Sequence, residues 1–424
     1  MARLAFKFPG GSDRVTRRLV MAFAFTQIIA WGSLYYSIAV LGPSIAAELG
    51  LSRSGLFGIV SLTLMVLGAT APTVGRLIDA TGGRMVMCAG SLLGAISCAT
   101  LALAPNVWVY MLGWAIGGVA MAMGLYDPAF ATLNRHTGTN YRRALTMVTL
   151  AGGFASTVFW PLTMQLLNAI GWRGAFGVFA LLHLCVNLPL HWFAIPAGGG
   201  ETNTAPAAPA LTPVAVAASA TTPAAPAAVP GVQPQTRVLL TWLTISFALA
   251  VFIGSTMSIH LLGLLQATGM TLGAAVTVGA VIGPMQVVGR LGEFLLGARV
   301  QPQSVGAAAV LLLVGAMAAL TLVDGSLRAG VVFAMLYGMG NGLMTIARGM
   351  VPAVLFGRVG YGARIGRIAR WVFFANAAAP ATYAALLGIG VGYRNSVLVL
   401  LALALLGVLA YRRAMVLARA LPAP

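Results

Sequence analysis

Long apolar runs, separated by short breaks that hold charges, glycines or prolines, follow one another along most of the chain. The runs are continuous and do not alternate with polar residues at every second position, which excludes the strands of a transmembrane barrel. A helix needs ~20 apolar residues to cross a bilayer. The pattern therefore predicts twelve transmembrane helices, near residues 19–42, 55–78, 84–104, 107–134, 143–168, 174–196, 238–264, 269–296, 304–324, 329–355, 366–390 and 394–417.

One segment of different composition, residues 197–236, separates the sixth run from the seventh. It consists largely of Ala, Pro and Thr, with seven prolines and a single charge, Glu201. Such a proline density prevents a helix, and side chains this small cannot build a core. We therefore expect a six-helix bundle over 1–196, a disordered cytoplasmic linker over 197–236 and a second six-helix bundle over 237–424.

The overall composition also points to a membrane protein. Of 424 residues, 59% are apolar and 8% are charged, and the mean hydropathy is +0.93. Soluble domains carry about 25% charged residues, so an ordinary soluble domain is excluded and the lipid bilayer is the expected surroundings. The formal net charge of +18 indicates membrane topology, and we expect no nucleic-acid partner.

The basic residues are distributed unevenly between the two sides of the membrane. If the loops alternate, the side with both termini collects 20 of the 25, whereas the opposite loops hold only Arg53, Arg173, Arg328 and Arg394. Cytoplasmic loops carry the excess of Lys and Arg. We therefore expect a multi-pass protein of a bacterial inner membrane with both termini in the cytoplasm.

The two halves of the chain repeat each other. Gly75–Asp79, after the second run, recurs as Gly289–Glu293 after the eighth, at an offset of 214 residues. Gly171–Arg173 recurs as Gly392–Arg394, at an offset of 221 residues. Repeated bundles are typical of membrane carriers, which move one half against the other around a site between them.

Motifs of hydrolytic, nucleotide and metal chemistry are absent from the sequence. The only lysine, Lys7, does not follow a Gly-rich loop, and no HExxH or GxSxG is present. The three cysteines, Cys88, Cys98 and Cys185, lie inside apolar runs without a CxxC spacing. We therefore expect no enzymatic activity, no cofactor and no metal site.

The loop after the second run resembles the signature of the major facilitator superfamily, Gly-x-x-x-Asp-Arg/Lys-x-Gly-Arg/Lys-Arg/Lys. Gly75, Asp79, Gly82 and Arg84 match it, whereas Ala80 replaces a basic residue. The resemblance implies an all-α integral membrane fold of twelve helices in two pseudo-symmetric six-helix bundles. It also implies secondary active transport by a monomer, with helices 1, 4, 7 and 10 lining a central cavity.

Three further segments, Thr26–Tyr36, Leu125–Phe130 and Gly360–Gly362, resemble a bacterial branch near the monocarboxylate transporters, which includes members linked to arsenite efflux. Trp160–Met164 lacks the Gly-Pro-x-x-Gly-Gly run of proton-coupled drug antiporters, and Met285 stands where oxalate-type relatives have an arginine. The resemblance implies a small polar or anionic solute, with protons as the coupling ion. The alternatives are a metalloid or drug efflux carrier and a non-transporting receptor or scaffold.

Polar residues in the cavity-lining helices are the candidate substrate contacts. Gln27, Trp31 and Tyr35 are spaced i, i+4 and i+8 along the first run and share one helix face. Helix packing or an interfacial aromatic belt is the alternative reading for them. His260, in the seventh run, is either a titrating group or a structural hydrogen-bonded histidine.

Two charges lie inside the runs, Asp127 and Arg348, separated by 221 residues and therefore at matching places in the two halves. A lone charge in a membrane helix costs at least ~2.5 to 3.5 kcal/mol on insertion scales, so each needs a partner or water. Either each bonds separately to nearby loops or backbone, or the two meet as the inner gate closes. In the second case Asp127 is the candidate proton carrier and Arg348 the candidate attractor of an anionic substrate.

The repeated loops are the candidate gating elements. We expect them to hold the halves together through charges and helix-end contacts, with Asp79 and Arg84 in the first copy and Glu293 and Arg299 in the second. The expected gating residues are Gly75, Asp79, Arg84, Gly289, Arg290 and Glu293.

Overall fold

The computed structural model describes residues 13–197 and 234–420, which are helical almost throughout. Among them, eleven continuous helical stretches are long and apolar enough to cross a membrane. One stretch, Gly138–Ala194, has 57 residues, and the backbone leaves the helical conformation inside it at Gly171 (φ 71°, ψ 176°). Since ~20 residues suffice for one crossing, this stretch makes two, and the twelve crossings predicted from the sequence are present.

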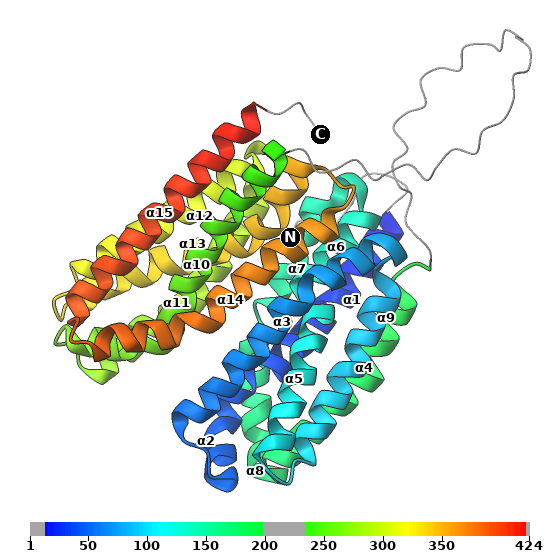
Figure 1. The fold of residues 1–424 in the computed structure, drawn as a ribbon, viewed down its shortest axis with the longest axis horizontal. Coiled ribbons are helices and arrows are strands. Elements are labelled where there is room, and N and C mark those ends of the chain that lie inside the picture. The colour runs from blue at the N-terminus through cyan, green and yellow to red at the C-terminus, as the bar shows by residue number, and fades with distance from the viewer. Residues whose placement is uncertain (1–12, 198–233, 421–424) are drawn as a thin grey trace, which may run out of the picture.

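The first half of the chain holds nine α-helices, and the second half holds six. They are α1 Asp13–Trp31, α2 Ile38–Leu49, α3 Arg53–Thr81, α4 Gly83–Ala102, α5 Val107–Gly124, α6 Tyr126–His136, α7 Tyr141–Gly152, α8 Ala155–Leu182, α9 Leu188–Ala194, α10 Pro234–Ala267, α11 Leu272–Leu296, α12 Pro302–Thr321, α13 Leu327–Phe356, α14 Tyr361–Gly388 and α15 Tyr393–Arg419. Figure 1 shows them as two adjoining groups, blue to cyan-green for the first half and green to red for the second.

The first crossing departs from a regular helix at a π-helical turn, Gly32–Tyr36, between α1 and α2. The Ser33 hydroxyl donates to the Ile29 carbonyl and also lies 2.8 Å from Nε2 of His183, which begins a second π-helical turn on the sixth crossing. A Cβ atom at Gly32 would overlap the Phe159 ring. Side-chain bonding to the preceding turn and close packing therefore set this bend.

Each half buries its own apolar core. One cluster of buried side chains runs from Leu19 to Ile195 and takes in a few residues of the second half, such as Phe373; the other runs from Leu239 to Ala414. The linker boundary differs slightly from the prediction, because α10 already begins at Pro234, where a proline at the start of a helix is tolerated. Residues 198–233, which hold most of the predicted linker, lie outside the described residues.

The two halves touch along α3 and α14, and also where α7 meets α11 and α13. Glycines allow the closest approach: a Cβ atom at Gly75 would overlap the Gly362 carbonyl, and one at Gly362 would come 2.8 Å from Asp79 Oδ1. We call the end of the molecule at which α1 begins, α9 ends, α10 begins and α15 ends the termini end (Figure 1). The functional contacts described next lie mainly there.

Candidate functional site

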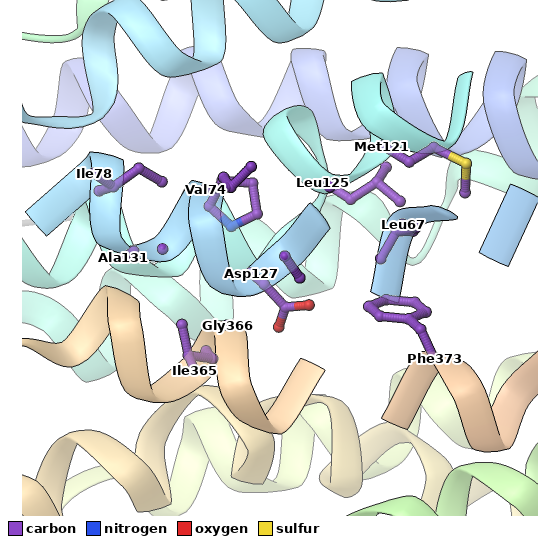
Figure 2. A pocket seen from close by; sticks show the side chains of 14 residues that line it. Leu67, Val74, Ile78, Met121, Leu125, Asp127, Ala131, Ile365, Gly366 and Phe373 are labelled. Carbon is purple, nitrogen blue, oxygen red and sulfur yellow. The ribbon is translucent and has the colours of Figure 1, made fainter. Parts of the chain in front are cut away.

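Asp127 and Arg348 meet at the interface between the halves. Arg348 Nη2 lies 3.5 Å from Asp127 Oδ1, and the two side chains are 18% and 14% exposed, respectively. Figure 2 shows the Asp127 carboxylate directed into the space between α3 and α14, near Phe373. The cavity beside it has a volume of about 10 Å³, enough for about one water molecule. In this conformation the two charges therefore pair with each other across the halves and do not bond separately to loops or backbone.

A proline explains why Asp127 stands at the start of a helix. The fourth crossing, expected as one run over 107–134, breaks at Leu125 between α5 and α6. Pro128 has no N–H to donate to the carbonyl of Gly124 four residues earlier. Gln27 Nε2 donates to that carbonyl instead, at 2.8 Å. The break places Asp127 in the first turn of α6, where a helix N-terminus favours a carboxylate.

Two members of the predicted shared face, Gln27 and Trp31, lie against the break between α5 and α6. Gln27 is fully buried and donates to the Gly124 carbonyl at the end of α5, and Trp31, the last residue of α1, packs against Tyr126 of α6. The Trp31 ring lies 5.3 Å from Tyr35, 6.2 Å from Tyr36 and 5.1 Å from Tyr126, between ring centroids. We call Trp31, Tyr35, Tyr36 and Tyr126 the aromatic cluster.

Arg290, one of the expected gating residues, is a buried cation that contacts the opposite half near the aromatic cluster. It is 5% exposed, its Nη1 donates to the Thr149 carbonyl on α7 at 3.0 Å, and its Nε has no partner. Among the described side chains, no carboxylate lies within 4.0 Å of it. A Cβ atom at Gly152 would overlap the Tyr126 hydroxyl, and one at the adjacent Gly153 would overlap Arg290 Nη1, which places Arg290 near this edge of the aromatic cluster. A buried arginine without a counter-ion is the kind of group that holds an anion.

Asp79 makes the helix-end contact expected of the first loop. Its two carboxylate oxygens accept hydrogen bonds from the backbone N–H groups of Gly362 (2.9 Å) and Ala363 (2.7 Å), in the first turn of α14. Arg84 is not its partner, since the guanidinium lies over the Trp192 ring, 4.2 Å from the centroid. The contact therefore joins α3 of the first half to the N-terminus of α14 in the second.

The second loop makes the corresponding contact with different chemistry. Glu293, 4% exposed, accepts from Arg142 Nε and from the Thr146 hydroxyl, both at 2.8 Å and both on α7. Arg142 also donates to the Val300 carbonyl at 2.6 Å. The partner is therefore Arg142 and not the expected Arg299. The acid of each repeated loop thus holds the opposite half, at the termini end.

Two of the other candidates have packing roles. Gly289 faces α13, where an added Cβ atom would lie 2.7 Å from the Met339 carbonyl, so it brings two helices of the same half together. His260 Nε2 lies 3.1 Å from the Pro380 carbonyl, and its ring centroid is 4.9 Å from that of Tyr383. Both neighbours are on α14, which corresponds to the structural reading of this histidine.

Several contact residues were not identified from the sequence. Two of them contact Arg290: the Thr149 carbonyl accepts from Nη1, and a Cβ atom at Gly153 would overlap Nη1. Tyr141 and Tyr361 form a further contact across the halves, with their hydroxyls 2.9 Å apart and each donating to the Gly349 carbonyl. The pair Gly152–Gly153 suggested a break in the helix, but a single sequence does not reveal which side chain packs against Gly153.

Sequence comparison identifies relatives over parts of the chain. A 184-residue stretch is 32% identical to the transcription regulatory protein OpdE of Pseudomonas aeruginosa and covers 42% of this chain and 44% of that protein. A 143-residue stretch is 27% identical to human monocarboxylate transporter 11 and covers 34% of this chain and 30% of that protein. The matched stretches thus span less than half the length of either relative.

Solved structures match the fold over nearly the whole chain. The human organic anion transporter MFSD10 (TETRAN) superposes with a TM-score of 0.67 at 16% identity, covering 95% of this chain and 100% of that one. The transporter FucP, in the outward conformation, superposes with a TM-score of 0.69 at 12% identity, covering 93% and 98%. The family model of the Major Facilitator Superfamily matches residues 23–363. This multi-pass membrane protein therefore belongs to the Major Facilitator Superfamily, a family of transporters and not of enzymes.

Proposed function

We propose that this protein is a proton-coupled secondary active transporter of a small organic anion. Family membership supports transport, and the observation that carries the substrate class is Arg290, a buried cation without a carboxylate partner beside the aromatic cluster. An uncompensated charge is expensive in a membrane protein. The carboxylate of a substrate supplies the missing counter-ion, and the aromatic cluster offers apolar surface to the rest of the molecule.

Arg348 is less suited to the same role while Asp127 holds it, because its charge is already partly compensated. The printed names of two related proteins, a monocarboxylate transporter and an organic anion transporter, agree with an anionic substrate. Those activities belong to the named proteins, and they support the proposal only as analogies.

The Asp127–Arg348 pair supplies a proton-coupling step in this proposal. Protonation of Asp127 removes its negative charge and with it the attraction to Arg348 across the two halves. The separation of 3.5 Å is longer than a strong charged hydrogen bond, and the adjoining cavity has room for about one water molecule beside the carboxylate. Binding of a proton to Asp127 therefore weakens the contact between the two halves and favours opening of the closed interface.

Alternating access requires the contacts at the termini end to break together. Asp79 with the N-terminus of α14 and Glu293 with Arg142 are the two matching contacts, one from each repeated loop. The arginine distribution supports a cytoplasmic position for this end. In our proposal the described conformation is closed toward the cytoplasm, and the substrate enters from the opposite side.

Transport by the purified protein in liposomes tests the proposal. A solute screen under an imposed pH gradient includes small mono- and dicarboxylates, a metalloid oxyanion, a neutral sugar and a cationic drug. We expect uptake of an organic anion that a protonophore abolishes. Arg290→Gln should remove this uptake, whereas Arg76→Gln, at the matching but exposed position of the first half, should preserve it.

The same screen distinguishes the alternatives. Uptake restricted to neutral or cationic solutes contradicts the substrate class. Uptake of the metalloid oxyanion alone favours the metalloid carrier. If no solute moves although the protein is folded in the liposomes, the non-transporting alternative is favoured, in line with the printed name of the Pseudomonas aeruginosa relative.

A further inference from the structure

On its α5 side, the break between α5 and α6 is held by a hydrogen bond and not by close packing. Gly124, the last residue of α5, is buried, yet an added Cβ atom there would have no neighbour within 4 Å. Its carbonyl accepts from Nε2 of the fully buried Gln27 at 2.8 Å. Because Pro128 lacks the N–H that would otherwise reach this carbonyl, the Gln27 amide takes the place of the missing helical donor.

Trp31, one helical turn after Gln27 on α1, contacts the other side of the same break. Its ring centroid lies 5.1 Å from that of Tyr126, the first residue of α6. Tyr126 also packs closely against α7, since an added Cβ atom at Gly152 would overlap its hydroxyl. The same face of α1 therefore contacts the end of α5 with an amide and the start of α6 with an indole ring. Asp127 is the next residue along α6.

The equivalent crossing of the second half has no such break. Gly349 stands at the place of Pro128, by the offset of 221 residues that relates the two paired charges. There α13 runs as a continuous helix from Leu327 to Phe356. Arg348 reaches the interface from this continuous helix with a long side chain. The side chain of Asp127 is much shorter, so its distance from the guanidinium depends on the path of the backbone that carries it.

We propose that Gln27 is a positioning residue for the Asp127–Arg348 pair. Its bond to the Gly124 carbonyl maintains the break between α5 and α6 and so keeps the Asp127 carboxylate within reach of Arg348. Since α1, α5 and α6 all belong to the first half, Gln27 acts inside one half on a contact between the two. The consequence for transport rests on the proposed proton-coupling role of Asp127, whereas the position of the carboxylate is measurable without transport.

A purely structural role for Gln27 gives a different expectation. If the amide only satisfies a buried carbonyl, its loss lowers the stability of the protein, and Asp127 stays beside Arg348. If the amide positions the break, its loss also moves the Asp127 carboxylate away from the guanidinium. A measurement on this carboxylate therefore separates the two roles.

Infrared spectroscopy of the purified protein in nanodiscs makes this measurement. The band of the Asp127 side chain is the one that Asp127→Asn removes, and its frequency changes when the carboxylate loses its hydrogen-bonded partner. The test variant is Gln27→Met, which has a similar length and no N–H. The matched control is Thr26→Val, because Thr26 is the preceding residue of α1, is fully buried, and its hydroxyl has no partner among the described residues.

We expect the Asp127 band of Gln27→Met to leave the wild-type frequency and move toward the frequency that it has in Arg348→Gln, because the carboxylate has lost the guanidinium in both. Thr26→Val should keep the wild-type frequency. A band of Gln27→Met at the wild-type frequency would overturn the positioning role. A band that Arg348→Gln leaves unchanged would show that the two charges do not interact and would overturn it as well. Gln27→Leu repeats the comparison if Gln27→Met does not fold.

Pro128→Ala tests whether Gln27 acts through the Gly124 carbonyl. The alanine supplies the N–H that can donate to this carbonyl along the helix. In the wild-type background, Gln27→Met should raise the equilibrium constant for unfolding at least about five-fold, and in the Pro128→Ala background at most about two-fold. An equal increase in both backgrounds would show that Gln27 acts elsewhere and would overturn the role of this bond.

Transport provides a third readout. Proton-driven uptake of a carboxylate by Gln27→Met should fall at least about ten-fold, and the dissociation constant of that carboxylate should stay within about two-fold of the wild-type value. A loss of carboxylate binding instead would make Gln27 a substrate contact and overturn the positioning role. A wild type that takes up no anion contradicts the proposed function alone, because the infrared and unfolding measurements require neither a substrate nor transport.

Discussion

Arg290 on α11 and Gly153 at the junction of α7 and α8 touch so closely across the two halves that a Cβ atom at 153 would overlap the guanidinium. The contact explains how an arginine of the second half reaches the aromatic cluster of the first half. Arg290 Nη1 donates to the buried Thr149 carbonyl in the last turn of α7, which also accepts from the Gly153 N–H.

Gly153→Ala should displace Arg290 and reduce the rate of anion uptake at least about ten-fold, because the displaced guanidinium loses its hydrogen bond to Thr149 and its place at the site. Gly177→Ala in α8 is the matched control, since an added Cβ atom there has no neighbour within 4 Å. Initial rates in liposomes, at equal amounts of folded protein, check the prediction. Equal rates for both variants would remove Gly153 from the site.

Asp127→Asn and Arg348→Gln should each impair transport strongly, because each leaves an unpaired charge or an unpaired amide near the bilayer interior. The exchange Asp127→Arg with Arg348→Asp should restore part of the activity if the contact between the side chains is what matters. Proton-driven uptake of the four proteins is the measurement. An exchange variant as inactive as the worse single variant, together with full activity of Asp127→Asn, would contradict both the pairing and the proton role.

Asp79→Asn should lower the turnover number several-fold and leave the KM for substrate within about two-fold. An amide keeps only one acceptor oxygen for the two N–H groups of α14 and has no charge for the helix end, so the closed state is less stable. Asp324→Asn, at an exposed position between α12 and α13, is the control. An unchanged turnover number would show that Asp79 only caps the N-terminus of α14 and has no role in gating.

Glu293 and Arg142 should show a coupling energy of about 1–3 kcal/mol in a double-mutant cycle with Glu293→Gln and Arg142→Gln. The Glu293 carboxylate is almost fully buried and its partner side chain is 23% exposed, which reduces the screening by solvent. Unfolding midpoints in nanodiscs provide the four free energies. A coupling energy near zero would mean that Glu293 is stabilised by its hydrogen bond to Thr146, and Arg142 by its hydrogen bond to Val300, without a contribution from the ion pair.

A reporter inserted between residues 198 and 233 should behave as cytoplasmic, because 20 of the 25 basic residues fall on the side of the termini. Alkaline phosphatase, which is active only outside the cytoplasm, and green fluorescent protein give opposite readouts. High phosphatase activity at this insertion would reverse the assigned orientation.

The helical crossings were predictable because a continuous run of ~20 apolar residues is as long as the hydrocarbon core of the bilayer is thick. The break at Leu125 was also readable in principle, since Pro128 removes a hydrogen bond from Gly124. The π-helical turn at Gly32–Tyr36 was not readable. It depends on His183 and Phe159, which are more than a hundred residues away in the sequence.

The site was predictable where the repeat supplied a second copy. Asp127 and Arg348 were paired through their common offset, which places them at equivalent positions of the two halves. Arg290 and its counterpart Arg76 occupy the same place in the repeated loop, but Arg76 is exposed and donates to Thr73, whereas Arg290 is buried. Arg290 is buried because it packs against α7 of the other half, and the sequence repeat alone does not reveal this contact.

The central claim, that Arg290 holds the negative charge of the substrate, is tested most directly by equilibrium binding. The dissociation constants of a transported carboxylate and of its neutral amide analogue are measured for the wild type, Arg290→Gln and Arg76→Gln. The account predicts that Arg290→Gln weakens carboxylate binding by on the order of ten- to a hundred-fold and leaves amide binding within about two-fold. Equal weakening of both ligands, or the same loss in Arg76→Gln, would contradict it.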